Sequence, residues 1–560
     1  MKNPISALSL SLVLGFSVPA IADQPADPAQ VPAQAPEISA QALRAHIEFL
    51  ADDLTEGRRT GTRGYDIAAR YVASMLAAAG LQPAGDDGSW FQNLTTVEGK
   101  LVEDSAEMIL RTADGQELPM IWQQDFLIGG SYADAETLID APVTFVGYGI
   151  TAPELAYDDY AGLDVRGHVV AFFGGAPEDF PGDQRAYYSS RSKLENAASR
   201  GAVGTVSFNT REAAERRPWE DTINAYQSPG MRWVDDDGSV QGLLPPIRGG
   251  AMLSPDGLSK LLAGSGQTRD QLYDAAETGQ TKSMTLPVEM KLYRRSEQIP
   301  YQSHNVVGVL PGSDPALASE YVVMSGHLDH LGIGVEYDGD GNYNGAYDNA
   351  TGIAIMLEVA RALATNEPRP ARSILFLAVT GEEQGLLGSD YFANHPTVPL
   401  SQIVANINLD MPIFTNATND IVAFGAEHSS LAGPTALAAE AIGMTLAPDP
   451  LPEEVIFIRS DQYSFVRQGV PAVYLMPGMT ATDPTVSGGS GLMDFLKNHY
   501  HKPSDELDLQ FDPDAAVRFT RLNYLLIREI ADQPQRPTWN AGDFFGDLFA
   551  RPAGATSTSP

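Results

Sequence analysis

Apolar residues in the second half of the chain alternate between the patterns of strands and helices. Continuous apolar runs at 321–326, 373–379 and 403–410 have the length and composition of buried strands. Between them, residues 352–365 and 386–395 carry apolar side chains at helical spacing. Buried strands separated by helices are typical of a parallel sheet covered on both faces. The pattern therefore predicts an α/β fold with a doubly wound, mixed, mainly parallel sheet in an α/β/α sandwich.

The flanking segments predict further helices and an insertion. Apolar spacing from Ser39, residues 65–79 and residues 514–531 each predict a helix with one buried face. Between about 100 and 290 the apolar runs are short, strand-like and broken by Gly, Pro and Asp. This change of pattern predicts an inserted, mostly β module.

The N-terminal residues predict an exported protein. Lys2 precedes an apolar stretch at 5–18, and Ala20 and Ala22 form a small-residue cleavage site, as in a signal peptide. The stretch is shorter than the roughly 20 residues that span a bilayer, so we expect no transmembrane segment after cleavage. The expected location is the periplasm or the extracellular space. The predicted parts are a signal peptide (1–22), a flexible leader (23–38), the N-terminal part of the main domain (39–135), the inserted module (136–290), the rest of the main domain (291–533) and a flexible tail (534–560).

Charge and cysteine content limit the kinds of partner and of metal ligand that the chain can have. The chain has 36 basic and 72 acidic residues and a formal net charge of −36. A polyanion would be repelled, which argues against a nucleic-acid or anionic membrane partner. Cysteine is absent, so any metal site must use imidazole and carboxylate ligands.

Polar residues gather where the predicted strands end. Taken singly each is ordinary, since a lone His is usually structural and an Asp before a helix is usually a cap. Ligands of open α/β sheets bind beyond the carboxyl ends of the strands, however, and many acids buried together there would be costly without cations. A pair of divalent cations bridged by a carboxylate resolves this, with zinc favoured and Mn²⁺ or Co²⁺ as substitutes. The residues concerned are His327, Asp348, Glu382, Glu383, Asp410 and His501.

Two further acids are candidates to orient the histidines. Asp329 lies two residues beyond His327 and could accept the other ring N–H. Asp505 could act in the same way on His501. His499 competes with His501 as the histidine of the site.

Five motifs carry a resemblance to a known family. "SGHLDHLG", "NGAYDNATG", "TGEEQGLLGS", "NLDM" and "YHKPSD" resemble, in order and spacing, the secreted di-zinc aminopeptidases that contain an inserted protease-associated (PA) domain. The resemblance implies that Glu382 is the general acid/base and that a cis peptide follows a bridging Asp348. It implies two zinc ions held by His327, Asp348, Glu383, Asp410 and His501.

The same resemblance implies a function. The chain is expected to be a zinc-dependent exopeptidase that hydrolyses the N-terminal peptide bond of peptides with a free N-terminus. Its PA domain would contact substrate or protein partners. The segment "IRSDQYSF" (458–465) and the preceding Phe457 are candidates to line the substrate pocket, although core packing explains the aromatic residues equally well. The candidates are Phe457, Arg459, Asp461 and Tyr463.

Three alternatives remain open at this stage. A carboxypeptidase on the same fold needs a basic cluster for the substrate carboxylate, for which Arg459 is a lone candidate. A glutaminyl cyclase usually works with one metal, and a non-catalytic receptor-like relative usually loses ligands. The acidic loop 338–342 fits either a surface turn or an incomplete calcium loop, because Tyr343 stands where such a loop has Gly.

Overall fold

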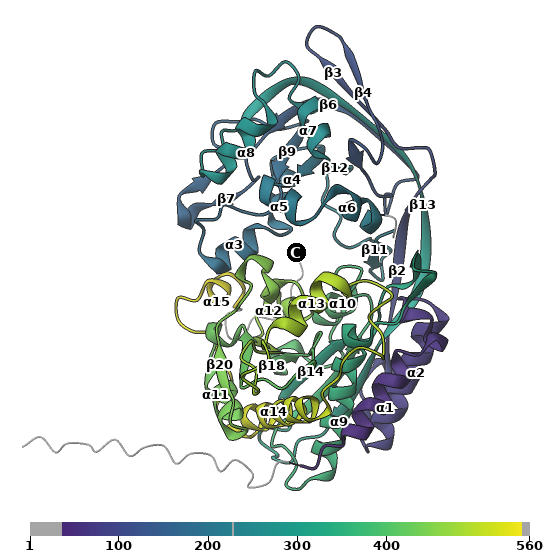
Figure 1. The fold of residues 1–560 in the computed structure, drawn as a ribbon, viewed down its shortest axis with the longest axis vertical. Coiled ribbons are helices and arrows are strands. Elements are labelled where there is room, and N and C mark those ends of the chain that lie inside the picture. The colour runs from purple at the N-terminus through teal and green to yellow at the C-terminus, as the bar shows by residue number, and fades with distance from the viewer. Residues whose placement is uncertain (1–35, 227–228, 551–560) are drawn as a thin grey trace, which may run out of the picture.

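The computed structural model describes residues 36–226 and 229–550, so the predicted signal peptide lies outside the described residues. Two parts are evident in Figure 1: a main domain (36–101 and 296–550) and an inserted module (102–295). Within the described ranges, no helix combines the length and apolar character needed to cross a membrane.

The main domain is built on one mixed sheet whose centre is parallel. Strands β17, β14, β18 and β21 run parallel in that order, and antiparallel strands extend both edges. The strands are β1 (Gln82–Pro83), β2 (Phe91–Leu101), β11 (Met231–Val234), the second half of β13 (Met284–Leu310), β14 (Tyr321–His327), β17 (Ser373–Val379), β18 (Ile403–Asn408), β19 (Asp420–Phe424), β20 (Thr445–Ala447) and β21 (Ala472–Pro477).

Helices cover both faces of this sheet, as the alternation along β17 requires. Phe376 packs in the core shared with helices α1, α9 and α14, whereas Leu375 packs with Phe392 of α10 and Phe465 of α12. The predicted α/β/α sandwich is confirmed. The helices are α1 (Ala40–Leu50), α2 (Arg63–Ala78), α9 (Thr351–Thr365), α10 (Leu387–Asn394), α11 (Ala432–Ala441), α12 (Gln462–Arg467), α13 (Ser490–Asn498), α14 (Pro513–Asp532) and α15 (Phe544–Phe549).

The inserted module is a mixed α/β unit, which corrects the expected mostly β character. Strands β6, β9, β10 and β12 run parallel, and helices connect them. The elements are β3 (Glu107–Thr112), β4 (Glu117–Met120), β5 (Phe126–Leu127), β6 (Glu136–Phe145), β7 (Thr151–Ala152), β8 (Tyr157–Asp158), β9 (Val169–Phe173), β10 (Gly204–Phe208), β12 (Gly250–Leu253), α3 (Gly182–Tyr188), α4 (Ser192–Ser199), α5 (Arg211–Arg216), α6 (Trp219–Tyr226), α7 (Pro255–Leu261) and α8 (Arg269–Glu277).

The module begins earlier than the predicted residue 136. Strand β3 pairs with the first half of β13, and β5 pairs with β12, so residues 107–127 belong to the module sheet. Strand β11, by contrast, leaves the module and pairs with β2 of the main sheet. The sequence pattern missed this boundary because these partners lie far away along the chain.

Strand β13 joins the two parts. Its first half pairs with β3 and β6, and its second half pairs with β2 and β17. Figure 1 shows it running as one strand along one side of both sheets. The two sheets therefore share a strand, and the chain enters the module through the short loop 102–106.

The C-terminal segment is folded up to Ala550, which corrects the expected flexible tail for residues 534–550. Asp543 caps α15, and Phe545 of that helix is 1% exposed and packs on Phe457 and His428. Asp543 Oδ2 lies 2.7 Å from His428 Nδ1, and the other ring nitrogen faces Asp183 of the module at 3.7 Å. Burial of its aromatic residues keeps this segment folded despite its Gly and Pro content.

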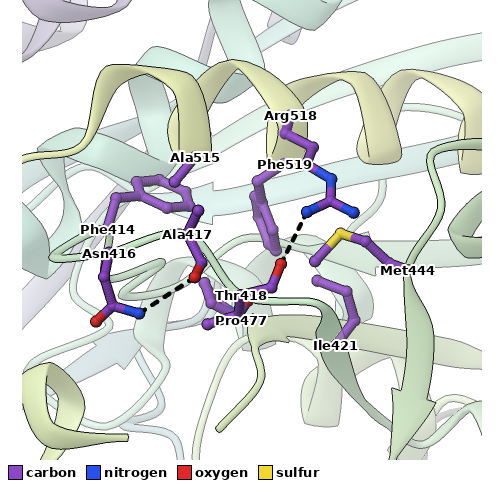
Figure 2. A pocket seen from close by; sticks show the side chains of 10 residues that line it. All are labelled: Phe414, Asn416, Ala417, Thr418, Ile421, Met444, Pro477, Ala515, Arg518 and Phe519. Atoms are coloured by element: carbon purple, nitrogen blue, oxygen red, sulfur yellow. Dashed lines mark hydrogen bonds between the residues drawn. The ribbon is translucent and has the colours of Figure 1, made fainter. Parts of the chain in front are cut away.

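A small cavity lies between α14 and the sheet edge (Figure 2). Its walls include Phe414, Met444 and Phe519, and Arg518 closes it by donating to the Thr418 carbonyl at 2.9 Å. The lining is a packing seam of α14 and contains none of the predicted metal ligands.

Candidate metal centre

The site forms where three neighbouring parallel strands end. Strand β14 lies between β17 and β18 and finishes at His327. Glu382 and Glu383 follow the end of β17, and Asp410 follows the end of β18. Strands β17 and β18, the next two parallel strands of the sheet along the chain, lie on opposite sides of β14. This edge is therefore a topological switch point, where open sheets bind ligands.

The two carboxylate oxygens of Asp348 face two different histidines. Oδ1 lies 3.2 Å from His327 Nε2, which is 3.1 Å from Asp410 Oδ1. Oδ2 lies 3.4 Å from His501 Nε2, which is 3.1 Å from Glu383 Oε2. Asp348 thus joins two groups, each with one imidazole and one further carboxylate.

These spacings fit two tetrahedral zinc ions. Ligand atoms about 2.0–2.1 Å from a zinc ion lie about 3.3 Å from one another. The four His–carboxylate distances of 3.1–3.4 Å match that value. The donor set is nitrogen and oxygen without sulfur, as the sequence predicts.

The pKa shifts of the clustered carboxylates and imidazoles show that the site favours positive charge. Burial raises the pKa of Asp348, but hydrogen bonds from His327 and His501 outweigh it and hold the pKa well below its usual range. Burial lowers the pKa of His327, but Asp410 and Asp348 outweigh it and raise the pKa well above 6.5. The carboxylates around these imidazoles favour a nearby positive charge, which a divalent ion can also supply.

Glu382 differs from its neighbour Glu383. Burial raises the pKa of Glu382 well above its usual range, against the opposing field of His327 and with the support of Asp410. Burial also acts on Glu383, but His501 outweighs it and lowers that pKa to about 2. One carboxylate is suited to hold a cation, and the other is suited to carry a proton.

Residues 305–527 match the model of peptidase family M28. The matched region contains all six candidate residues of the site, from His327 to His501. The chain is 38% identical over 137 residues to a "Probable zinc metalloprotease" of Pyricularia oryzae, covering 23% of this chain and 26% of that relative. It is 34% identical over 137 residues to "Aminopeptidase NAALADL1" of Rattus norvegicus, covering 23% of this chain and 16% of that relative.

A solved structure extends the likeness of the fold beyond residues 305–527. The "Aminopeptidase from Aneurinibacillus sp. strain AM-1" superposes with a TM-score of 0.52 at 17% identity. The match covers 89% of this chain and 95% of that one. At this identity the comparison concerns the fold alone.

The two acids expected to orient the histidines, Asp329 and Asp505, accept backbone N–H groups instead. His327 Nδ1 lies 3.1 Å from the backbone oxygen of Asp329, whereas the Asp329 carboxylate accepts the backbone N–H groups of Glu382 and Glu383 at 3.1 and 3.4 Å. The Asp505 carboxylate accepts the backbone N–H groups of Tyr347 and Asp348, both at 2.9 Å, and does not orient His501. A carboxylate near a histidine in sequence can equally satisfy backbone donors, and here both do.

Backbone features fix the bridging residue. The peptide between Asp348 and Asn349 is cis, as the family resemblance implies. The Asn349 side chain donates to the Leu409 carbonyl at 2.8 Å and to the His327 carbonyl at 3.4 Å. Asn349 therefore ties the turn before α9 to the ends of β14 and β18, a role the sequence did not reveal.

His330 is a site residue that the sequence reasoning missed. It is 1% exposed, and its Nδ1 lies 2.7 Å from Glu383 Oε1 and 3.9 Å from Asp348 Oδ2. Its position in "HLDHLG", three residues after His327, was the available signal. Its contact places a third imidazole behind the Glu383 carboxylate.

The candidate pocket residues separate into two groups. Phe457 and Tyr463 pack in the aromatic cluster that holds α15, and Arg459 is exposed and pairs with Glu454 at 2.9 Å. Asp461 is fully buried, and neither of its carboxylate oxygens has a hydrogen-bond partner in the described part of the chain. Burial raises the pKa of Asp461 to about 7 against the opposing field of His327. Of the four, Asp461 alone is buried within the electrostatic field of the candidate ligands His327 and Asp410.

The structure also bears on two alternatives from the sequence: which histidine faces Asp348, and what the acidic loop 338–342 forms. His499 Nδ1 contacts the Ser504 side chain at 3.0 Å, and His501 is the histidine that faces Asp348. The acidic loop is a tight turn at Asp338 between β15 (Gly332–Tyr337) and β16 (Asp340–Tyr343), with exposed side chains. This geometry is that of a surface hairpin turn.

Proposed function

We propose that this chain is a zinc-dependent aminopeptidase that removes N-terminal residues from peptides. The observation that carries the proposal is the division of the Asp348 oxygens between two His–carboxylate groups. The M28 match, the zinc metalloprotease relative and the aminopeptidase relatives support it. The chain matches 26% of the length of the zinc metalloprotease relative and 16% of the length of the aminopeptidase relative.

The residues divide into two ligand groups. His327 and Asp410, with Oδ1 of Asp348, would hold one zinc ion. His501 and Glu383, with Oδ2 of Asp348, would hold the other. When bound, such a pair supplies a nucleophilic hydroxide at neutral pH and polarises the scissile carbonyl.

Glu382 is the proton carrier of the proposed reaction. With its pKa raised, its carboxylate takes one proton from the attacking water and passes it to the leaving amine nitrogen as the C–N bond breaks. Asp329 positions Glu382 by accepting its backbone N–H. A free substrate α-amine is cationic, and the surrounding acids favour it at this site.

The structure does not favour a carboxypeptidase. That activity needs cations for the substrate's terminal carboxylate. Arg459, the candidate named from the sequence, is already paired with Glu454 and exposed. We further propose export through residues 1–22, with the inserted module acting as a PA domain that contacts substrate or partners.

The test compares the wild type with Glu382→Gln and with the exposed control Glu336→Gln on aminoacyl p-nitroanilides. We expect zinc content to be unchanged in both variants. In Glu382→Gln alone, kcat should fall by roughly 10²- to 10⁴-fold, the usual contribution of general acid–base catalysis. Full activity in Glu382→Gln refutes the mechanism, and equal cleavage of N-acetylated substrates refutes the exopeptidase assignment.

A further inference from the structure

Arg58 is fully buried beneath the loops of the proposed zinc site. It is 0% exposed, and among the described residues its guanidinium donates only to backbone carbonyl oxygens. Burying a guanidinium costs several kcal/mol unless its N–H groups are satisfied. Its acceptors are the carbonyls of Leu328 (2.9 Å), Leu50 (2.5 Å), Asn344 (2.6 Å) and Gly345 (3.0 Å).

These carbonyls belong to segments that carry different ligands. Leu328 directly follows His327, and Gly345 lies three residues before Asp348. Leu50 is the last residue of α1. One side chain therefore connects the backbone beside His327 with the backbone beside Asp348 and anchors both to a helix end.

The backbone around Arg58 is built to deliver this side chain. Glu56, Gly57 and Arg58 have φ values of 51°, 63° and 49°, and left-handed conformations are unfavourable for non-glycine residues. A Cβ on Gly57 would lie 2.5 Å from the Tyr343 oxygen and 2.6 Å from the Gly332 oxygen. The turn is thus pressed against the β15–β16 hairpin, and its strained path directs Arg58 inward.

Arg58 also stays charged. Burial lowers its pKa to about 10, so the guanidinium is protonated at neutral pH. It faces the acids Asp505, Asp348, Asp329 and Glu383. A cation at this position repels a divalent ion. Any favourable contribution of Arg58 to zinc binding must therefore come from its hydrogen bonds.

We propose that Arg58 is a positioning residue that fixes the separation of His327 and Asp348 and thereby sets the affinity for zinc. The inference rests on the proposed zinc site. The planar guanidinium reaches carbonyls on several segments at once, whereas a lysine ammonium is a compact charge with three donors at one point. A lysine at position 58 therefore keeps the positive charge without the set of hydrogen bonds, so an experiment can separate the two contributions.

The test uses Arg58→Lys, Arg58→Gln and the control Arg372→Lys. Arg372 is also 0% exposed, donates to the Ile530 carbonyl and pairs with Glu320, but it precedes β17 at the end opposite to Glu382. The zinc dissociation constant is measured by competition with a chromophoric chelator, and the Tm of the zinc-free protein is measured separately. We expect both Arg58 variants to bind zinc about 10- to 100-fold more weakly. The control should lower Tm and leave zinc affinity unchanged.

Three outcomes overturn the inference: wild-type zinc affinity in Arg58→Lys, tighter binding in Arg58→Gln, or equal weakening in Arg372→Lys. If the Arg58 variants do not fold, Gly57→Ala keeps the guanidinium and displaces its turn. That variant should also weaken zinc binding at least about 10-fold, and unchanged affinity refutes the inference. A wild type that binds no zinc or cleaves no substrate refutes the proposed function itself, which is a separate result.

Discussion

Replacing Asp505 with Asn tests how far its hydrogen bonds to the backbone hold Asp348 in position for zinc. Asp505 is fully buried, and its two oxygens each accept one backbone N–H, from Tyr347 and Asp348, at 2.9 Å. Asn has the same shape but only one acceptor oxygen. Its NH₂ group must face one of the two N–H groups, so one buried donor loses its partner.

The size of the effect follows from that lost partner. A buried donor left unsatisfied costs about 1–3 kcal/mol. The unpaired donor would lie in the turn that carries Asp348, and zinc binding requires Asp348 in place, so we expect the cost to reduce zinc affinity. At about 1.4 kcal/mol per tenfold, zinc binding should weaken by roughly 5- to 150-fold.

The assay is chelator competition at pH 7 on the wild type and Asp505→Asn, with Asp508→Asn as an outer-loop control. Asp508 is exposed and close to Asp505 in sequence, so its replacement should leave zinc affinity unchanged. Activity at saturating zinc should recover toward the wild type in Asp505→Asn. An unchanged zinc dissociation constant in Asp505→Asn would show that these hydrogen bonds do not position Asp348.

Other predictions concern the remaining parts of the molecule. Phe545→Ala should destabilise the protein by about 3–5 kcal/mol, because a buried aromatic side chain is removed; an unchanged Tm would show that α15 docks weakly. Burial lowers the pKa of Lys193 to about 7, so between pH 7 and about 10 the unfolded chain binds more protons. Wild-type stability should gain up to about 1.4 kcal/mol per pH unit over that range, and Lys193→Met should abolish this gain in pH-dependent denaturant titrations. Removal of zinc with EDTA should lower Tm, and readdition at a thousandfold excess over Kd should restore about 4 kcal/mol; a Tm indifferent to zinc would contradict the ligand assignment.

The sheet and its ligands were accessible from the sequence for a physical reason. Buried parallel strands leave continuous apolar runs, so the polar residues at their ends stand out. Asp410 after β18 and the pair at 382–383 after β17 were located in this way, and the structure brings them to one edge with His327. The distinction between Glu382 and Glu383 needed the family resemblance, because spacing does not reveal which carboxylate faces a histidine.

Other features left no sequence signal because they depend on backbone groups or distant partners. Arg58 and Asn349 bond to carbonyl oxygens, which every residue possesses. Strand β3 pairs with β13 across a long stretch of chain, so the module boundary had no local pattern. Phe545 lies among Gly and Asp, whose turn preference hid its burial.

The register between β2 and β13 has a consequence for how the module is carried. Leu101 and Ser296 are direct partners in the antiparallel ladder, so the chain departs into the module and returns at facing positions, about 5 Å apart between Cα atoms. That is the span of an ordinary β-hairpin turn, which two residues can close. The module therefore occupies the place of a hairpin loop between β2 and β13. It is also attached at two further places, because β11 pairs with β2 and Asp183 faces His428 at 3.7 Å. A shorter unit inserted at this position should keep the pairing of β2 with β13, but the main sheet would lose its β11 edge strand.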